Sequence, residues 1–125
     1  MNVIGLDHLV ITTQNLDACL DFYVRVLGMR AEKKNGRYAL HFGRQKINIH
    51  RHRGEFQPAA ANATYGSADV CLLMEGPVDS VAADLAASGW PIELGPVPRT
   101  GATGPITSIY VRDPDGNLIE LSVAA

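Results

Sequence analysis

One stretch near the C-terminus decides the fold, and it reads Arg112-Asp-Pro-Asp-Gly-Asn-Leu-Ile-Glu120-Leu-Ser-Val123. Its Asp-Pro-Asp-Gly segment is a turn signal, and the residues after it alternate as they do in a β-strand. Ile119, Leu121 and Val123 share one face of that strand, so Glu120 points to the opposite face. An unpaired buried carboxylate is costly. We therefore expect Glu120 to have a partner: a cation, a hydrogen-bond donor or a metal ion.

The composition is that of an ordinary folded protein of one domain's length, with 125 residues, 46% hydrophobic and 19% charged. A formal net charge of −2 argues against a nucleic-acid partner, and we read the basic run at residues 51–53 as a solvated strand end. The two cysteines, Cys19 and Cys71, form no Cys-x-x-Cys motif, so we expect reduced thiols. The N-terminal residues lack the pattern of a signal peptide and no apolar run has membrane length, so we expect a cytoplasmic protein without a membrane partner.

The first half of the chain predicts a strand, a helix and three further strands. The first strand covers residues 5–13, and Asn15 is a candidate N-cap for a helix that ends at Gly28. Its apolar stripe repeats at helical spacing. Short strands follow at residues 30–34, 38–42 and 46–52, with a hairpin turn at Asn35-Gly36.

The second half repeats this order, with strands at residues 68–73, 92–94, 108–112 and 118–123 and a helix at 78–85. A shift of 61 places His8 on Asp69, and a later shift of 72 places Asn48 on Glu120. We therefore predict an α+β fold of two βαβββ modules in a curved mixed sheet. Module one covers about residues 1–53, a linker about 54–66 and module two about 67–125.

The repeat also aligns polar residues that oppose the aliphatic face of their strands. They are His8, Asn48 with His50, Asp69 and Glu120. Nitrogen and oxygen donors of this kind suit Zn²⁺, Mn²⁺, Fe²⁺, Ni²⁺ or Co²⁺. The alternative for His8 and Glu120 is a buried hydrogen bond, and Asp69 could equally cap a turn.

Three segments resemble the vicinal oxygen chelate superfamily, also called the glyoxalase/bleomycin-resistance/dioxygenase group. They are Leu6-Asp-His8-Leu-Val-Ile, Phe22-Tyr-Val-Arg-Val-Leu-Gly28-Met and Ile109-Tyr-Val-Arg-Asp-Pro-Asp-Gly-Asn-Leu-Ile-Glu120. Residues 42–50 and 95–105 further resemble small glyoxalase-domain proteins, some of them bacterial and virulence-associated. The resemblance implies paired βαβββ modules around a divalent metal, often across a homodimer.

Carried over position by position, the resemblance places metal ligands at His8, Asn48, Asp69 and Glu120. Asp69 stands where a His is common, and Asn48 stands where glyoxalase I enzymes have a Glu. His50, about 7 Å beyond Asn48 on the same face, is a displaced ligand, a general base or a substrate contact. The expected metal set is therefore His8 and Glu120 with Asp69 or His50, and the metal Mn, Zn, Ni, Mg or Fe. Glu120 and His50 are the catalytic candidates, and Asn48 a candidate substrate contact.

The resemblance implies three functions. The first is a metal-dependent glyoxalase-like lyase or isomerase that chelates a small substrate through two oxygens. The loss of one metal-side Glu argues against a standard glyoxalase I. The alternatives are a metal-free, bleomycin-resistance-like protein that sequesters a small ligand, and an extradiol-type dioxygenase, for which a two-His, one-carboxylate triad would need His50.

Two further residues are candidate substrate contacts. The stretch 95–105, rich in Gly and Pro, predicts either a lid or clamp in which Arg99 binds a carboxylate or phosphate, or a rigid surface loop. Tyr110 lies on a strand beside the expected groove. We expect the 54–66 connection, anchored by Phe56 and Tyr65, to allow a homodimer.

Overall fold

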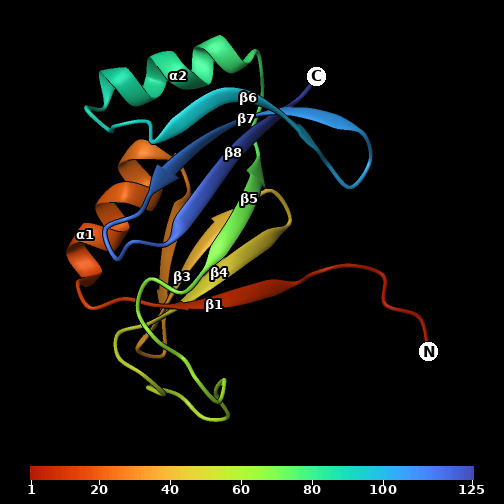
Figure 1. Cartoon of the computed structure of the whole chain (residues 1–125). Coiled ribbons are helices and arrows are strands. Elements are labelled where there is room, and N and C mark those ends of the chain that lie inside the picture. Colours follow the sequence, from red (N-terminus) through yellow and green to blue (C-terminus); the bar gives the residue numbers. More distant parts are fainter. The chain divides into compact units, whose positions relative to one another are not determined.

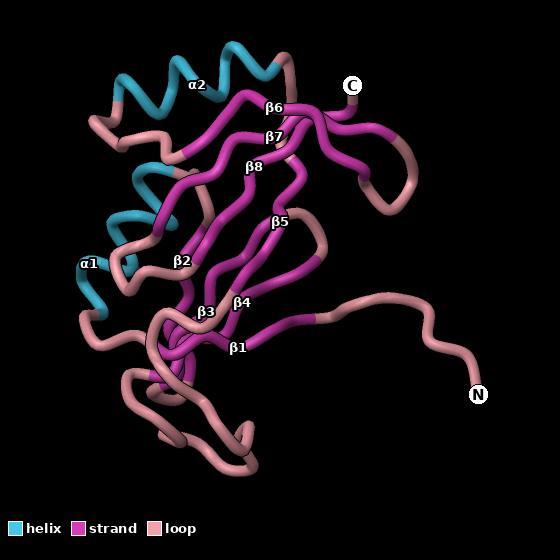
Figure 2. Tube along the Cα trace, in the orientation of Figure 1, coloured by secondary structure: helices cyan, strands magenta, loops and turns pink.

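The computed structural model describes all 125 residues, and they divide into two compact units, Met1–Ser67 and Ala68–Ala125. Each unit contains one four-stranded mixed sheet and one helical segment (Figures 1 and 2). No helix in the chain has the length and apolar character needed to cross a bilayer. The fold is α+β, and the predicted two βαβββ modules are confirmed.

The first unit has its strands in the order β1-β4-β3-β2, so the first and last strands of the module lie side by side in parallel. The strands are β1 (His8–Thr12), β2 (Arg30–Lys34), β3 (Arg37–Phe42) and β4 (Gln45–His50). Asn35 and Gly36 both have positive φ, 54° and 75°, as the predicted two-residue hairpin between β2 and β3 requires.

The helical segment of the first unit starts as predicted but does not stay α-helical. The Asn15 side chain accepts a hydrogen bond from the Ala18 amide and caps α1 (Leu16–Leu20). The chain continues as a π-helical segment, η1 (Asp21–Val26), in which the Leu27 amide bonds the Phe22 carbonyl five residues back. The expected regular helix up to Gly28 is therefore wrong in its second half.

The second unit repeats the topology, with strand order β5-β8-β7-β6. Its strands are β5 (Asp69–Leu73), β6 (Leu94–Thr100), β7 (Pro105–Arg112) and β8 (Leu118–Ala124). The helix α2 (Val78–Ala87) packs against β7 and β8 (Figure 1). Val81 and Leu85 are its buried side chains, and Ile109, Ile119 and Leu121 are buried in the sheet.

Most of the predicted lid is a strand. Residues 94–100 form β6, which pairs antiparallel with β7, and only residues 101–104 form the connecting turn. Pro96 and Pro98 are tolerated because β6 is an edge strand. Gly95 lies so close to β7 that a Cβ there would be 2.5 Å from the Ser108 carbonyl oxygen, and its φ is 114°. The Gly and Pro residues thus mark an edge strand with a bulge, where we expected a free loop.

The strand registers reproduce the internal repeat. His8 lies opposite Lys46 on β1 and β4, and Asp69 lies opposite Leu118 on β5 and β8. These pairs are related by the shifts of 61 and 72 that the sequence predicted. In each unit the aliphatic residues of the paired strands share one face. We call the opposite face the polar face of each sheet.

Candidate functional site

Glu120 has hydroxyl partners on the polar face of the second sheet. Ser108 Oγ donates to Glu120 Oε2 at 2.6 Å, and Ser122 Oγ lies 3.3 Å from the same oxygen. Ser108 and Ser122 are fully buried and lie opposite each other on β7 and β8, with their hydroxyls 2.7 Å apart. Both hydrogen bonds fall on Oε2, which leaves Oε1 for a ligand. The expected partner of this carboxylate is thus a hydrogen-bond donor.

Cys71 extends this hydroxyl chain. It lies directly opposite Glu120 on β5, and its Sγ is 3.2 Å from Ser122 Oγ. In the contacts of Ser122 with Cys71 and with Ser108, either partner can be the donor, while Ser108 donates to Glu120. Partial burial raises the pKa of the Cys71 thiol, and the negative charge of Glu120 raises it further. Cys71 is therefore a protonated donor at neutral pH, which disfavours it as a thiolate ligand.

Asp69 lies on the same polar face, next to the Cys71–Glu120 pair. It is opposite Leu118, two residues before Glu120 on β8, which makes Asp69 and Glu120 diagonal neighbours. Its side chain is exposed and caps no turn; the Ala68 amide is instead capped by Asn117 Oδ1 at 2.9 Å. Asp69 makes no turn-capping hydrogen bond, and its role as a metal ligand stays a prediction.

Arg99 and Tyr110 are brought together, although Arg99 lies on β6 and not in a lid. Arg99 Nε donates to the Tyr110 hydroxyl at 3.0 Å, and the guanidinium carbon lies 5.5 Å from the centre of the tyrosine ring. Tyr110 is directly opposite Glu120 on β8. The second sheet therefore presents Arg99, Tyr110, Glu120 and Asp69 from a single polar face.

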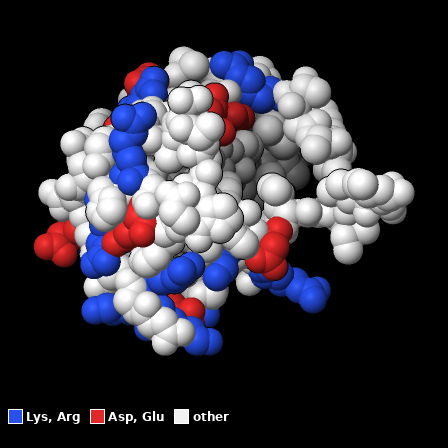
Figure 3. Space-filling model, turned by 90° about the horizontal axis from the view of Figure 1, so that it is seen from below, with Lys and Arg blue, Asp and Glu red and all other residues white.

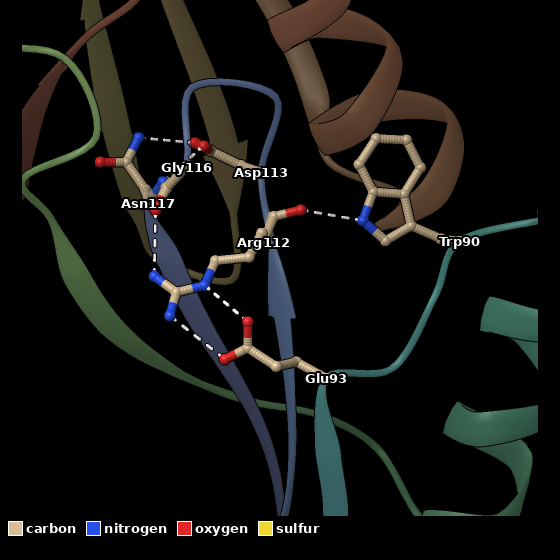
Figure 4. A network of polar contacts seen from close by, with 6 residues as sticks. All are labelled: Trp90, Glu93, Arg112, Asp113, Gly116 and Asn117. Atoms are coloured by element: carbon tan, nitrogen blue, oxygen red, sulfur yellow. Dashed lines mark hydrogen bonds and ion pairs between the residues drawn. The ribbon is translucent and has the colours of Figure 1, made fainter.

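The turn at residues 113–117 fixes the register of this face (Figure 4). Asp113 is buried, and its Oδ1 accepts from the Asp115 and Asn117 amides while its Oδ2 accepts from Asn117 Nδ2. Outside the turn, Arg112 forms a two-pronged ion pair with Glu93, which lowers the pKa of Glu93 and raises that of Arg112. This turn sets the pairing of Ser108 and Tyr110 with β8, and so builds the Glu120 network.

In the first unit, His8 lies at the edge of its sheet. Its Nδ1 is 2.8 Å from Asp7 Oδ2, and the pKa of Asp7 is lowered by this hydrogen bond. When Nδ1 carries the proton, Nε2 is left as an acceptor, which is the arrangement found in metal-binding histidines. The sequence had suggested a His–Glu hydrogen bond as the alternative for His8, but its partner is Asp7.

Asn48 and His50 lie on the polar face of the first sheet, where they line a pocket of about 610 Å³. The pocket lies between the polar side chains of β2, β3 and β4, and Phe56 also borders it. The ring of Phe56 contacts His50 edge-on at 5.4 Å. Phe56 thus anchors the 54–66 connection as expected. His41 does not line the pocket, but it approaches Glu32, which does, at 3.4 Å.

The register limits which donors of the first unit can act together. His8 and Asn48 are diagonal neighbours, equivalent to Asp69 and Glu120. His50 lies opposite Thr12, four residues from His8, or about 13 Å along the strands. His8 and His50 of one unit are therefore too far apart to share one ion. Neither unit by itself gathers three or more His, Cys, Asp or Glu side chains into a group that could hold a metal.

Sequence reasoning missed several polar residues around these candidates. Ser108 and Ser122 could have been found by counting outward from the 113–117 turn, which places 112 opposite 118 and 108 opposite 122. Asp7 lay inside the predicted strand 5–13, but β1 begins only at His8, and nothing in the sequence pattern indicated that Asp7 would bond His8. The pocket residues on β2 and β3 were predicted only as parts of strands, with no function assigned to them.

Comparison with known proteins places the chain in a family. The family model for the Glyoxalase/Bleomycin resistance protein/Dioxygenase superfamily matches residues 5–121. The chain is 50% identical over 118 residues to virulence protein STM3117 of Salmonella typhimurium, covering 94% of this chain and 82% of that protein. It is also 50% identical over 123 residues to glyoxalase domain-containing protein RDO1 of Mycosarcoma maydis, covering 98% and 69%.

Solved structures agree. The crystal structure of STM3117 superposes with a TM-score of 0.96 at 47% identity over 100% of both chains. Two more distant structures share the fold alone. Lactoylglutathione lyase from Agrobacterium tumefaciens has a TM-score of 0.72 at 24% identity, covering 95% of this chain and 92% of that chain. The antibiotic binding protein TnmS3 from Streptomyces has a TM-score of 0.75 at 20% identity, covering 100% and 99%. The chain belongs to the Glyoxalase/Bleomycin resistance protein/Dioxygenase superfamily.

Proposed function

We propose that this chain is a divalent-metal-dependent, glyoxalase-like lyase or isomerase that acts on a small substrate with two neighbouring oxygens. The observation that carries the proposal is the Glu120 carboxylate, which is fixed through Oε2 by Ser108 and keeps Oε1 for a ligand. Membership of the superfamily supports it. The metal, one of Mn, Zn, Ni, Mg or Fe, would be held by His8 and Glu120, with Asp69 or His50 as the third protein ligand.

The donor chemistry fits such an ion. Glu120 and Asp69 are carboxylates on one face of the second sheet, and His8 has its Nδ1 beside Asp7 and its Nε2 available. Imidazole and carboxylate donors suit these metals. Because His50 lies four residues from His8 in the strand register, it joins His8 only if the two come from different chains. Asp69 lies beside Glu120 on the same sheet and is therefore the third ligand that we favour.

The other catalytic and binding roles fall to residues of the chain. A bound divalent ion would supply Lewis-acid stabilisation of negative charge on the substrate oxygens. Glu120 or His50 would take a proton from one carbon of the substrate and return it to the adjacent carbon. Arg99 and Tyr110 would orient the substrate beside Glu120, and Asn48 would contact it from the first sheet. We further propose that the protein acts as a homodimer, which the 54–66 connection accommodates.

The test is an assay of metal-loaded protein on the hemithioacetal of a 2-oxoaldehyde with a small thiol, next to a catechol ring-cleavage assay. We expect isomerisation, with loss of at least 100-fold in kcat for Glu120→Gln, because the base and one ligand are changed together. Ser80→Ala is the control, since Ser80 bonds only the Pro77 carbonyl in its own helix turn. Ring cleavage without isomerisation would contradict the proposal and favour the dioxygenase reading.

A second candidate is sequestration of a small ligand without catalysis. The pocket on the first sheet favours it, because its volume of about 610 Å³ and its aromatic border suit a ligand by themselves. Tight binding of a small molecule with no turnover in any metal-loaded form would support this candidate over the enzyme.

A further inference from the structure

The pocket of the first unit is a hollow built around a small side chain. Ala39 lies at the middle of the polar face, opposite Asn48 on β4 and Glu32 on β2. Larger side chains on either side of Ala39 border the hollow. Its volume of about 610 Å³ falls within the range of small-molecule sites.

One end of the hollow carries two cations that face each other. Lys34 and Arg37 are direct cross-strand partners at the β2–β3 hairpin, and both line the pocket. Like charges at directly opposite positions of a sheet destabilise it. No carboxylate lies within ion-pairing distance of either, since the ion pairs of the chain involve other Arg and His residues. An anion between Lys34 and Arg37 would remove this repulsion.

The Arg37 side chain is held in place before any ligand arrives. Its guanidinium lies 4.2 Å from the centre of the Phe56 ring, and Phe56 in turn contacts His50. Stacking on the ring leaves the edge of the guanidinium, with its N–H donors, directed away from the aromatic face. Such a fork matches the two oxygens of a carboxylate or phosphate.

The distribution of charged residues between the two units also favours an anion as the ligand of this hollow. The first unit, residues 1–67, holds nine of the eleven Lys and Arg residues but only five of the thirteen Asp and Glu residues. The second unit holds the other two cationic and eight acidic residues. In Figure 3, Lys and Arg side chains are most frequent along the lower part of the face, with others at the top and on the left and Asp and Glu side chains among them. Lys46 borders the same hollow at its other side. A chain with a net negative charge therefore presents a locally positive hollow, which attracts anions.

We propose that this hollow binds the oxyanion group of a small organic molecule, a carboxylate or a phosphate, between Lys34 and Arg37. The rest of the molecule lies over Ala39 toward Asn48. The inference rests on the proposed function only in taking this molecule to be the substrate, because the oxyanion contacts need no metal.

The experiment titrates metal-free protein, treated with EDTA and exchanged into low-salt buffer, with inorganic phosphate and with succinate, followed by calorimetry or amide NMR. We expect saturable binding of at least one of them, one site per chain. Arg37→Gln and Lys34→Gln should each weaken it at least tenfold. The control is Arg25→Gln, which removes the same charge from a residue that pairs with Asp21 outside the pocket. Folding of each variant is checked by circular dichroism.

Arg37→Lys gives a second reading, because it keeps the charge and removes the fork; intermediate affinity supports the assigned contact. The tighter of the two probes identifies the oxyanion. Absence of saturable binding, or equal weakening by Arg25→Gln, would overturn the inference.

His8→Ala and Glu120→Ala separate this inference from the proposed function. If both retain oxyanion binding while losing metal, the two sites are independent and the inference stands. If oxyanion binding appears only after metal is added, the inference is wrong and the metal proposal survives. If the oxyanion binds but no metal ever does, the inference stands and the proposed metal-dependent function is wrong.

Discussion

Glu120 and its hydroxyl partners are the best-defined part of the candidate site at the scale of single residues. The alternation around Glu120 predicted its face and its need for a partner, and both are confirmed. The identity of that partner could not be predicted, because it depends on the register between β7 and β8. For the same reason the sequence did not indicate that Asp7 would bond His8.

Removal of the Ser108 hydroxyl should loosen Glu120. In Ser108→Ala the Oε2 atom loses its 2.6 Å hydrogen bond, and we expect the free energy of unfolding to fall by about 1–2 kcal/mol. Metal affinity should fall about tenfold, as it does when groups that orient metal ligands are lost. Thermal unfolding and metal titration measure the two effects. Ser108→Thr, which keeps the hydroxyl, should restore metal affinity; if it does not, Ser108 contributes through packing alone.

The Cys71 thiol reports on the charge of Glu120. Because partial burial and then Glu120 raise the pKa of Cys71, its alkylation by iodoacetamide should reach half-maximal rate at a pH above the usual thiol value. In Glu120→Gln that midpoint should move to lower pH. Cys19 is fully buried and serves as the internal control for unfolding. An unchanged midpoint in Glu120→Gln would mean that the two side chains do not interact.

At the scale of elements, turn chemistry gave the most reliable predictions. The Asn35-Gly36 hairpin, the Asn15 cap and the strand after the 113–117 turn were predicted and are confirmed. The edge strand β6 was missed because Gly and Pro in sequence do not distinguish a loop from an edge strand with a bulge. The π-helical turn of η1 was missed because its apolar pattern resembles that of an α-helix.

The segment 51–56 positions the aromatic border of the pocket. Glu55 is 8% exposed and accepts from both the Arg51 amide and the Arg51 guanidinium, at 2.8 and 2.7 Å. The Arg51 contact lowers the pKa of the Glu55 carboxyl. Phe56, which follows, stacks on Arg37. We therefore expect the ion pair to support the oxyanion site.

The contribution of the Arg51–Glu55 ion pair to stability can be tested by changing the pH. A carboxyl with a lowered pKa stabilises the folded state at pH values above its ordinary pKa, and the stabilisation is lost as the pH falls through the lowered value. Glu55→Gln should therefore be less stable than wild type by about 1 kcal/mol at neutral pH. The difference should shrink below the ordinary Glu pKa of about 4.3 and be lost once the pH has fallen through the lowered pKa of Glu55. Urea unfolding across pH measures it, with the exposed Glu75→Gln as control. A pH-independent difference would show that the charge of Glu55 is not the cause.

Over the whole chain, the internal repeat determines how the strands of each unit are arranged. The shifts of 61 and 72 predicted which strands pair and which residues share a polar face. The two repeats differ in the charge of their polar faces. The first has an excess of cations, with Lys34, Arg37 and Lys46 against Glu32 around its pocket. On the second, the carboxylates Asp69 and Glu120 share the face with Arg99. This divergence follows from no local pattern and became visible only when the registers were known. Under the two proposals, the first repeat would bind the oxyanion and supply His8, and the second would supply the carboxylate ligands Glu120 and Asp69.

The most direct test of the account is the metal content of untagged protein, measured by mass spectrometry beside His8→Ala and Glu120→Ala. We predict close to one divalent ion per chain, retained in Arg25→Gln and lost in both ligand variants, because each removes a donor that the others cannot replace. No bound metal in the wild type, even after dialysis against Mn²⁺, Zn²⁺, Fe²⁺ and Ni²⁺, would contradict the account and leave a ligand-binding protein without metal chemistry.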